Sequence, residues 1–157
     1  MYQANTTAGF SIVTYTGTGS NGTIAHGLGA VARMVIIKNR DQTDNWAVGH
    51  TDIGFSNHLQ LNVTDASTSA SAVFNSTAPT STVFSVGTNH KTNASSEDYI
   101  AYVFAEVEGY SKFGTFTGND DADGPFVYTG FRPAFFILRD TANAGSWVIY
   151  DSVRDTI

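Results

Sequence analysis

The sequence contains no cysteine, which excludes disulfide bonds, thiolate metal sites and cysteine nucleophiles. Charged residues are also scarce, at 14% of the 157 residues, and the eight lysines and arginines form no basic run. The formal net charge is −6, so we expect no nucleic-acid partner, because phosphate binding needs clustered cationic side chains. No apolar run approaches the length that spans a membrane, so we expect no membrane insertion.

The first residues of the sequence do not have the pattern of a secretory signal. Met1 to Thr7 contain neither a basic segment nor an apolar one, so they do not resemble a secretory signal. If the protein works outside a cell, we expect something other than a cleaved signal to take it there. An extracellular protein of this size without disulfides depends on its core, on a metal or on oligomerisation.

What the sequence does contain indicates an all-β protein. Aromatic residues reach 13%, and serine, threonine and glycine are abundant. Apolar segments between Gly-, Asn- and Ser-rich turns predict strands, with residues 33–38 as a central strand buried on both faces. No segment has a helical period. Short strands at this spacing favour a β-sandwich or jelly roll. The strands are expected over residues 10–16, 23–28, 33–38, 46–50, 59–63, 72–74, 82–86 and 99–107.

An internal repeat organises the chain. Segments of the first unit recur about 100 residues later, in the same order and with matching residue classes. We therefore predict a first β repeat over residues 1–108 and about half of a second over residues 109–157. The matching segments are Gly9-Phe10-Ser11 with Gly109-Tyr110-Ser111, Tyr15-Thr16-Gly17 with Phe116-Thr117-Gly118, Gly27-Leu28 with Gly130-Phe131, Met34 to Lys38 with Phe135 to Arg139, and Asn45 to His50 with Ser146 to Asp151.

Half a sandwich would leave the apolar segment Phe135 to Leu138 without a covering sheet. An uncovered apolar sheet face aggregates unless another layer packs on it. The half repeat is therefore expected to pack on the first unit, to be completed by a neighbouring chain, or to belong to a longer array. The last two possibilities are favoured over a self-contained monomer, so the expected partners are further copies of the chain, in a homo-oligomer or polymer, or neighbouring repeats.

The combined motifs resemble a known kind of domain. They are Tyr15-Thr16-Gly17, His26-Gly27-Leu28-Gly29, Met34 to Arg40, Tyr99 to Glu106, Gly109 to Gly114 and Gly124 to Pro133. Together they are similar to the repeated domains of uncharacterised function in tail and tail-fibre proteins of tailed bacteriophages, especially marine ones. Two features depart from that pattern: Ala32 stands where proline is usual, which Pro133 keeps, and the second unit lacks its later strands.

The resemblance implies a structural or host-adhesion role in an extracellular fibre, with no catalytic residue to carry over. We therefore expect a structural repeat and not an enzyme. The first alternative is a carbohydrate-binding module that recognises host surface glycans, and the second is a depolymerase that cleaves them. No Gly-x-Ser-x-Gly elbow supports a serine hydrolase. A glycosidase needs two carboxylates, and the acidic residues that could supply them are Asp41, Asp44, Asp52, Glu97, Asp98, Glu106 and Glu108.

Two tryptophans recur at the same repeat position. Trp46 and Trp147 each follow a polar loop, where an indole ring can stack on a sugar ring. With His50, Asp52 and Asp151 they form the candidate glycan platform. The alternative is that both tryptophans anchor the core, as large aromatic residues do in many sandwiches.

The acidic turn of residues 119–124 is a candidate calcium site. Asn119, Asp121 and Asp123 fall at positions 1, 3 and 5 of a calcium loop, although Gly130 stands where the bidentate carboxylate belongs. The alternative is a solvated turn whose side chains cap its own backbone. No other cofactor is expected. The four histidines have no metal-ligand spacing and are predicted to lie hydrogen-bonded at the surface.

Overall fold

The computed structural model describes residues 1–154. Most of its regular elements are strands, and its two α-helices are single turns of four residues. The strands are β1 (Tyr2–Asn5), β2 (Phe10–Thr16), β3 (Gly22–Ala25), β4 (Ala32–Asn39), β5 (Ala47–His50), β6 (Asn57–Gln60), β7 (Thr68–Ser69), β8 (Val83–Val86), β9 (Asp98–Ala105), β10 (Phe135–Leu138) and β11 (Val148–Asp151). The helices are η1 (Thr51–Ile53), α1 (Ser71–Phe74) and α2 (His90–Asn93).

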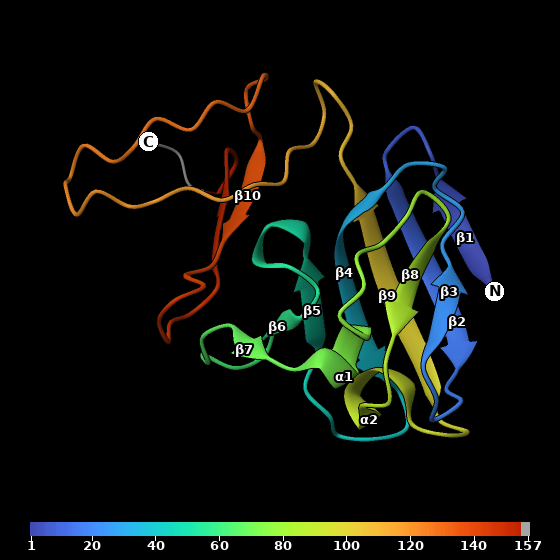
Figure 1. Ribbon diagram of the computed structural model, residues 1–157. Helices are drawn as coiled ribbons and strands as arrows, with labels where there is room; N and C mark the ends of the chain where they lie inside the picture. Colours follow the sequence, from blue (N-terminus) through green and yellow to red (C-terminus); the bar gives the residue numbers. More distant parts are fainter. Residues whose placement is uncertain (155–157) are drawn as a thin grey trace.

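Seven strands form one antiparallel sheet, in the order β1-β2-β9-β4-β5-β6-β7 (Figure 1). Strand β9 is late in the sequence but lies between β2 and β4, with Phe10 opposite Phe104 and Met34 opposite the same residue on the other side. Its side chains alternate between buried and half-buried, because successive residues of a strand point to opposite faces.

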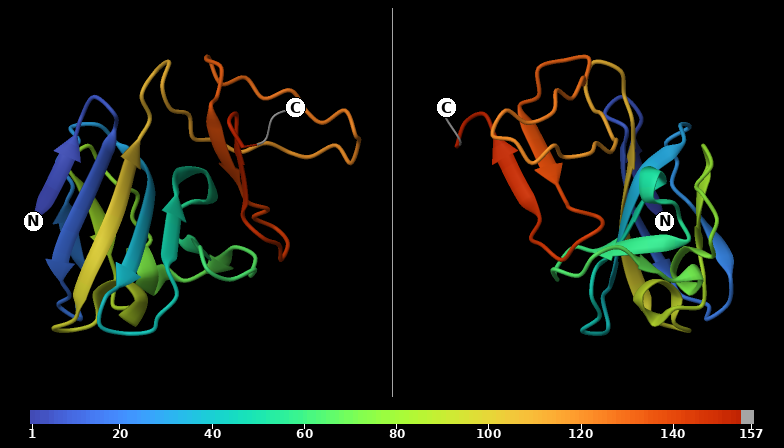
Figure 2. Two further views of the ribbon diagram at one scale, coloured as in Figure 1. Left: turned by 180° about the vertical axis from the view of Figure 1, so that it is seen from behind. Right: turned by 60° about the vertical axis from the view of Figure 1, so that its left-hand side comes forward.

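The core lies between this sheet and a second layer, in which β3 pairs with β8 beside α1 and α2 (Figure 2). The sheet contributes Val35, Ile37 and Val103, and the second layer contributes Phe74 and Phe84, all of which have no exposed surface. Two layers that bury one shared core are the arrangement expected of a small β domain.

The all-β prediction is confirmed, and so is the strand over residues 10–16. Two finer predictions are wrong. Residues 72–74 belong to helix α1, whose Val73 and Phe74 enter the core. Strand β4 is buried on one face only, because Arg33, Met34, Ile36 and Lys38 are half-buried. The jelly-roll and repeat interpretations, and the boundary at residue 108, stay predictions.

The pair β10–β11 stands apart from the seven-stranded sheet (Figures 1 and 2). Its register matches that of β4–β5. Met34 lies opposite His50, and Phe135 lies opposite Asp151, so both partners lie 101 residues later (135 less 34, and 151 less 50). The turns that follow β4 and β10 also match: the Oδ1 atom of Asn39 accepts bonds from two backbone amides of its turn, and that of Asp140 does the same.

Candidate functional site

The two candidate tryptophans lie near the same segment of the chain. The carbonyl of Trp46 accepts a bond from the Leu61 amide at 3.1 Å, and the Trp147 Nε1–H donates to the Gln60 carbonyl at 3.0 Å. Both are half-buried, and neither belongs to the core, so the core alternative is wrong. The Trp46 ring stacks on the Tyr102 ring, with 6.2 Å between the ring centroids. Trp46 therefore packs on the outer face of the sheet, away from the core.

His50 and Asp52 lie at the opposite end of β5 from Trp46. The His50 Nδ1 accepts a bond from the Asp52 amide at 3.2 Å, and the Asp52 carboxylate lies 3.4 Å from the Arg33 guanidinium. Asp151 caps the turn that follows β11 and pairs with Arg154. The five predicted platform residues therefore occupy three separate places, and glycan binding by the five together stays a prediction.

The acidic turn hydrogen-bonds to its own backbone. The Asn119 Oδ1 accepts from the Asp121 amide at 3.3 Å, and the Asp121 Oδ1 accepts from the Asp123 amide at 3.0 Å. All three residues are exposed. This is the geometry of a solvated turn with side-chain caps, and calcium binding here stays a prediction.

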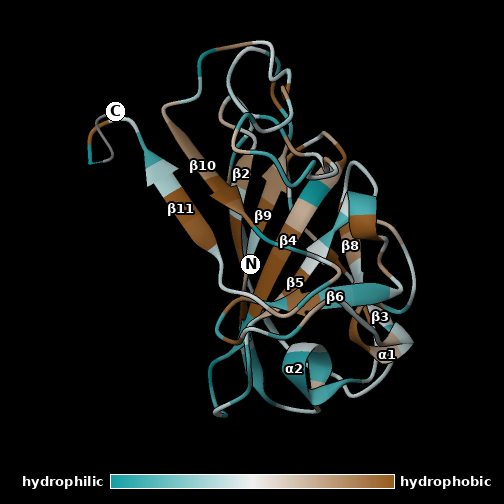
Figure 3. Cartoon of the chain, turned by 90° about the vertical axis from the view of Figure 1, so that its left-hand side faces the viewer, coloured by the Kyte–Doolittle hydropathy of each residue, from teal (hydrophilic) through white to brown (hydrophobic). Residues whose placement is uncertain are grey.

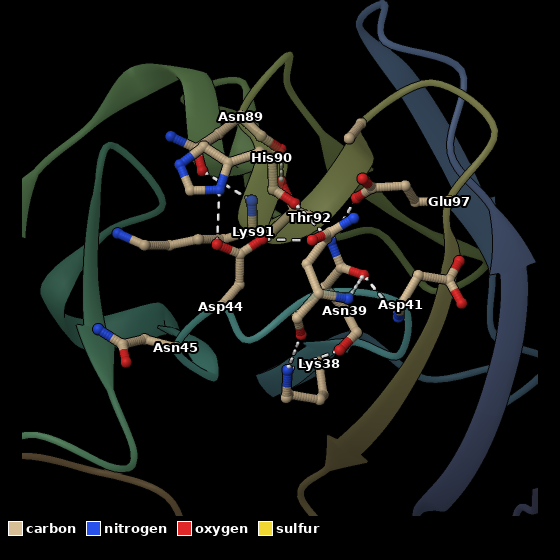
Figure 4. Close-up of polar contacts among 12 residues, drawn as sticks. Lys38, Asn39, Asp41, Asp44, Asn45, Asn89, His90, Lys91, Thr92 and Glu97 are labelled. Carbon is tan, nitrogen blue, oxygen red and sulfur yellow. Dashed lines mark hydrogen bonds and ion pairs between the residues drawn. The ribbon is translucent and has the colours of Figure 1, made fainter.

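A polar cluster that the sequence analysis missed joins β4, α2 and the segment before β9 (Figure 4). Asn39 has no exposed surface. Its Nδ2 lies 2.5 Å from Glu97 Oε2 and 3.2 Å from Asp44 Oδ2, from the His90 carbonyl and from the Tyr99 hydroxyl. An amide has only two N–H groups, so these four oxygens share them. One buried side chain thus holds three segments of the chain together.

The Tyr99 hydroxyl completes this cluster. It donates to the His90 carbonyl at 2.6 Å and accepts from the Ala94 amide at 2.8 Å. Burial raises the pKa of Tyr99 to about 12, so the hydroxyl keeps its proton and its donor role at neutral pH. No pattern of residue types in the sequence marks this cluster, because its members come from positions up to 60 residues apart.

Two histidines are buried, so the surface prediction is wrong for them: His26 has no exposed surface and His58 has 4%. The Leu28 amide donates to His26 Nδ1 at 3.3 Å, which leaves Nε2 to carry the proton and donate to the Thr80 carbonyl at 3.2 Å. Both ring nitrogens are therefore satisfied in the neutral form, which explains how the core tolerates the ring.

We expect acidification to destabilise the fold through these histidines. Burial lowers the pKa of His26, and burial followed by the Lys91 charge lowers the pKa of His58. The unfolded chain, with a histidine pKa of about 6.5, then binds more protons than the folded one. Stability is fully present above this pH and falls below it, by at most about 1.4 kcal/mol per pH unit for each histidine.

Urea unfolding at several pH values from neutral to mildly acidic measures this slope. The matched variants His26→Gln and His58→Gln should each be less stable at neutral pH and lose less stability on acidification. A free energy of unfolding that stays constant as the pH falls through the histidine range would contradict the assignment.

Strands β10 and β11 carry hydrophobic residues (Figure 3), and several of their apolar side chains are exposed. These side chains are 41% to 56% exposed, and in the described residues β10 pairs only with β11. The equivalent positions of β4 and β5 include Val35, Ala47 and Val48, which are buried in the core. We call this set the β10–β11 surface. Phe136, Val148 and Tyr150 lie on the face that matches the buried face of β4–β5, and Phe135 and Ile149 lie on the opposite face.

The cover of this surface must differ in shape from the cover of the first hairpin. A Cβ added at Gly49 would lie 2.6 Å from the Phe55 ring and 2.9 Å from the Phe74 ring, so the first hairpin admits these rings only because a side chain is missing. Tyr150 stands at the matching register position of the second hairpin, and its ring stacks on Phe136 at 4.9 Å.

The chain matches one family among known proteins. A family model with the description "Domain of unknown function (DUF7483)" matches residues 1–157. No curated protein and no solved structure matches the chain. Within residues 1–154, no helix is long and apolar enough to cross a membrane.

Proposed function

The chain belongs to that family, and we propose that it is a structural and adhesive repeat of an extracellular phage tail fibre or a similar fibrous appendage. In this proposal, chains or neighbouring repeats assemble by packing their sheets together. The observation that carries the proposal is the β10–β11 surface, which repeats the register of β4–β5 but has no covering layer in the described residues.

Two properties of this surface favour assembly through it. Apolar side chains on a sheet face gain free energy when a second layer removes them from water. Strand β10 also contains four apolar residues and no charge, Phe-Phe-Ile-Leu, so two copies can approach without like charges meeting there. A net charge of −6 spread over the rest of the chain keeps it dispersed until such a specific contact forms.

We expect the protein to associate beyond the 16.8 kDa monomer as its concentration rises. Light scattering over a wide concentration range measures this mass. The variants Phe136→Lys and Val148→Lys place a charge on the face of the hairpin that matches the buried face of β4–β5, at side chains 43% and 41% exposed. Each should weaken association by about tenfold or more, because an unpaired charge in an apolar contact is costly.

The matched control is Phe126→Lys, which changes an equally apolar side chain that is 89% exposed and outside the hairpin. It should leave the mass unchanged. Repeating the measurement with calcium and with a chelator tests whether the acidic turn contributes. A wild-type protein that stays a monomer at every concentration would refute assembly by sheet packing.

A further inference from the structure

An open groove of about 570 Å³ lies where the two predicted units meet. Its residues come from η1, from β6, from the loop that precedes β7, and from two loops of the predicted second unit. The Ser67 amide donates to the Thr141 carbonyl at 3.0 Å, so the two sides are bonded together. This volume falls within the range of about 300 to 1,000 Å³ that is usual for small-molecule sites. The groove is lined by Asp52, Ile53, Asn57, Ser67, Thr115, Phe116, Thr117, Thr141 and Ala142.

The lining is polar without being cationic. Six of its nine side chains carry a carboxylate, an amide or a hydroxyl group, and none is lysine, arginine or histidine. Arg33 pairs with Asp52 from outside the lining, so an anionic ligand in the groove would meet the Asp52 carboxylate and no cationic lining residue. A purely apolar ligand would leave the hydroxyl groups without partners. The lining therefore favours a neutral ligand that is rich in hydroxyl groups.

Two of the polar side chains, Asp52 and Asn57, are held in place by neighbouring groups. Arg33 lies 3.4 Å from one carboxylate oxygen of Asp52, and the His50 ring accepts the Asp52 amide. The Asn57 Nδ2 donates to the Ile53 carbonyl at 2.8 Å, which leaves its Oδ1 as the amide's acceptor. The groove thus presents fixed acceptors, which suit the O–H donors of a ligand.

One aromatic ring supplies the apolar contact. Phe116 is 50% exposed, and it is the only aromatic residue of the lining. A ring at this place can pack against the C–H groups of a ligand while its neighbours Thr115 and Thr117 bond to hydroxyl groups. Alternating apolar and hydroxyl character within one small ligand describes a pyranose sugar.

We propose that this groove binds a neutral pyranose ring, with Phe116 as the stacking surface and with Asp52 and Asn57 as acceptors of its hydroxyl groups. The site differs from a platform built on the tryptophans: neither Trp46 nor Trp147 lines it, and Asp52 is its only residue in common with that platform. The proposal does not depend on chain assembly, because every residue of the lining belongs to one chain.

Saturation-transfer NMR with a panel of methyl pyranosides tests the proposal. The panel contains the glucoside, galactoside, mannoside and N-acetylglucosaminide, with glucuronate as the anionic counterpart. We expect at least one neutral sugar to bind in the millimolar range, as a single ring with few contacts should. Glucuronate should bind several-fold more weakly, because its carboxylate would face Asp52.

Phe116→Ala should weaken sugar binding about tenfold or more. Asp52→Asn should reduce the difference in affinity between the neutral sugar and glucuronate. The matched control Phe126→Ala removes an exposed ring outside the groove and should leave binding unchanged. Circular dichroism checks that each variant is folded. Absence of transfer to every sugar, equal binding of glucuronate, or unchanged binding by Phe116→Ala would each overturn the proposal.

Discussion

Asn39→Ala is expected to lower the free energy of unfolding by about 3 kcal/mol or more, because it strips partners from several buried groups. The Glu97 and Asp44 carboxylates and the Tyr99 hydroxyl would lose the amide that they share. The turn after β4 would also lose the acceptor of two backbone amides. Urea unfolding at neutral pH measures the loss.

The chain supplies a matched control for this change. Asp140 caps the equivalent turn after β10, with its Oδ1 accepting from the Ala142 and Asn143 amides at 2.8 and 3.0 Å. It is exposed and contacts no buried cluster. Asp140→Ala should therefore remove the same turn contacts but lower the free energy of unfolding by only a small fraction of the loss expected for Asn39→Ala. Equal losses for the two variants would mean that the turn alone matters and that the cluster contributes nothing.

Asn39→Asp separates the two roles of this side chain. The variant keeps an acceptor for the turn but sets a carboxylate against Glu97 and Asp44. Like charges in a buried site raise one another's pKa values, so this variant should be destabilised at neutral pH and should recover part of the loss on mild acidification. Wild-type protein should show the opposite trend, because its buried histidines favour neutral pH.

Phe74→Ala is expected to cost about 3 to 5 kcal/mol, the usual range for removing a fully buried aromatic side chain. The Phe74 ring has no exposed surface and meets the Phe55 ring edge-on at 5.3 Å. Its loss would open a cavity beside Gly49, against which the Phe74 ring packs. Domains of this size are stable by about 5 to 15 kcal/mol, so the variant should be close to unfolding at physiological temperature.

Thermal and urea unfolding measure this loss, with Phe126→Ala as the matched control. Phe126 is 89% exposed, and surface substitutions of this kind usually change stability by less than about 0.5 kcal/mol. A Phe74→Ala variant as stable as the control would show that the layer of α1 and β8 is not packed on the sheet as described.

The sequence predicted most of the strands because their residues alternate or form compact apolar runs. It could not predict helix α1, because Ala72-Val73-Phe74 suits a strand equally well. Tertiary contacts decide the outcome there: the Val73 carbonyl accepts bonds from the Gly87 amide and the Thr92 hydroxyl, at 3.0 and 2.8 Å. These partners lie 14 and 19 residues away, counted as 87 and 92 less 73.

The sequence also placed His50 and Asp52 together as candidate site residues, and the structure joins them through one hydrogen bond. It could not place Phe116 beside Asp52 and Asn57, because only the folded chain brings these segments, about 60 residues apart, to one groove. It missed the burial of His26 for a related reason. A histidine is tolerated in a core when both ring nitrogens find partners, and the Thr80 carbonyl is 54 residues away.

The central position of β9 has a consequence for how the chain acquires its fold. Strands β2 and β4 do not pair with each other, and each pairs with β9, whose last residue is Ala105. The main sheet therefore cannot close during synthesis until the chain has been made as far as Ala105. Its contacts span many residues, which slows folding, whereas the β10–β11 hairpin is local and can close quickly once it has been made. Until β9 has been made, β2 and β4 are therefore unpaired on the sides that β9 will occupy, and the nascent protein is most prone to aggregate during this period.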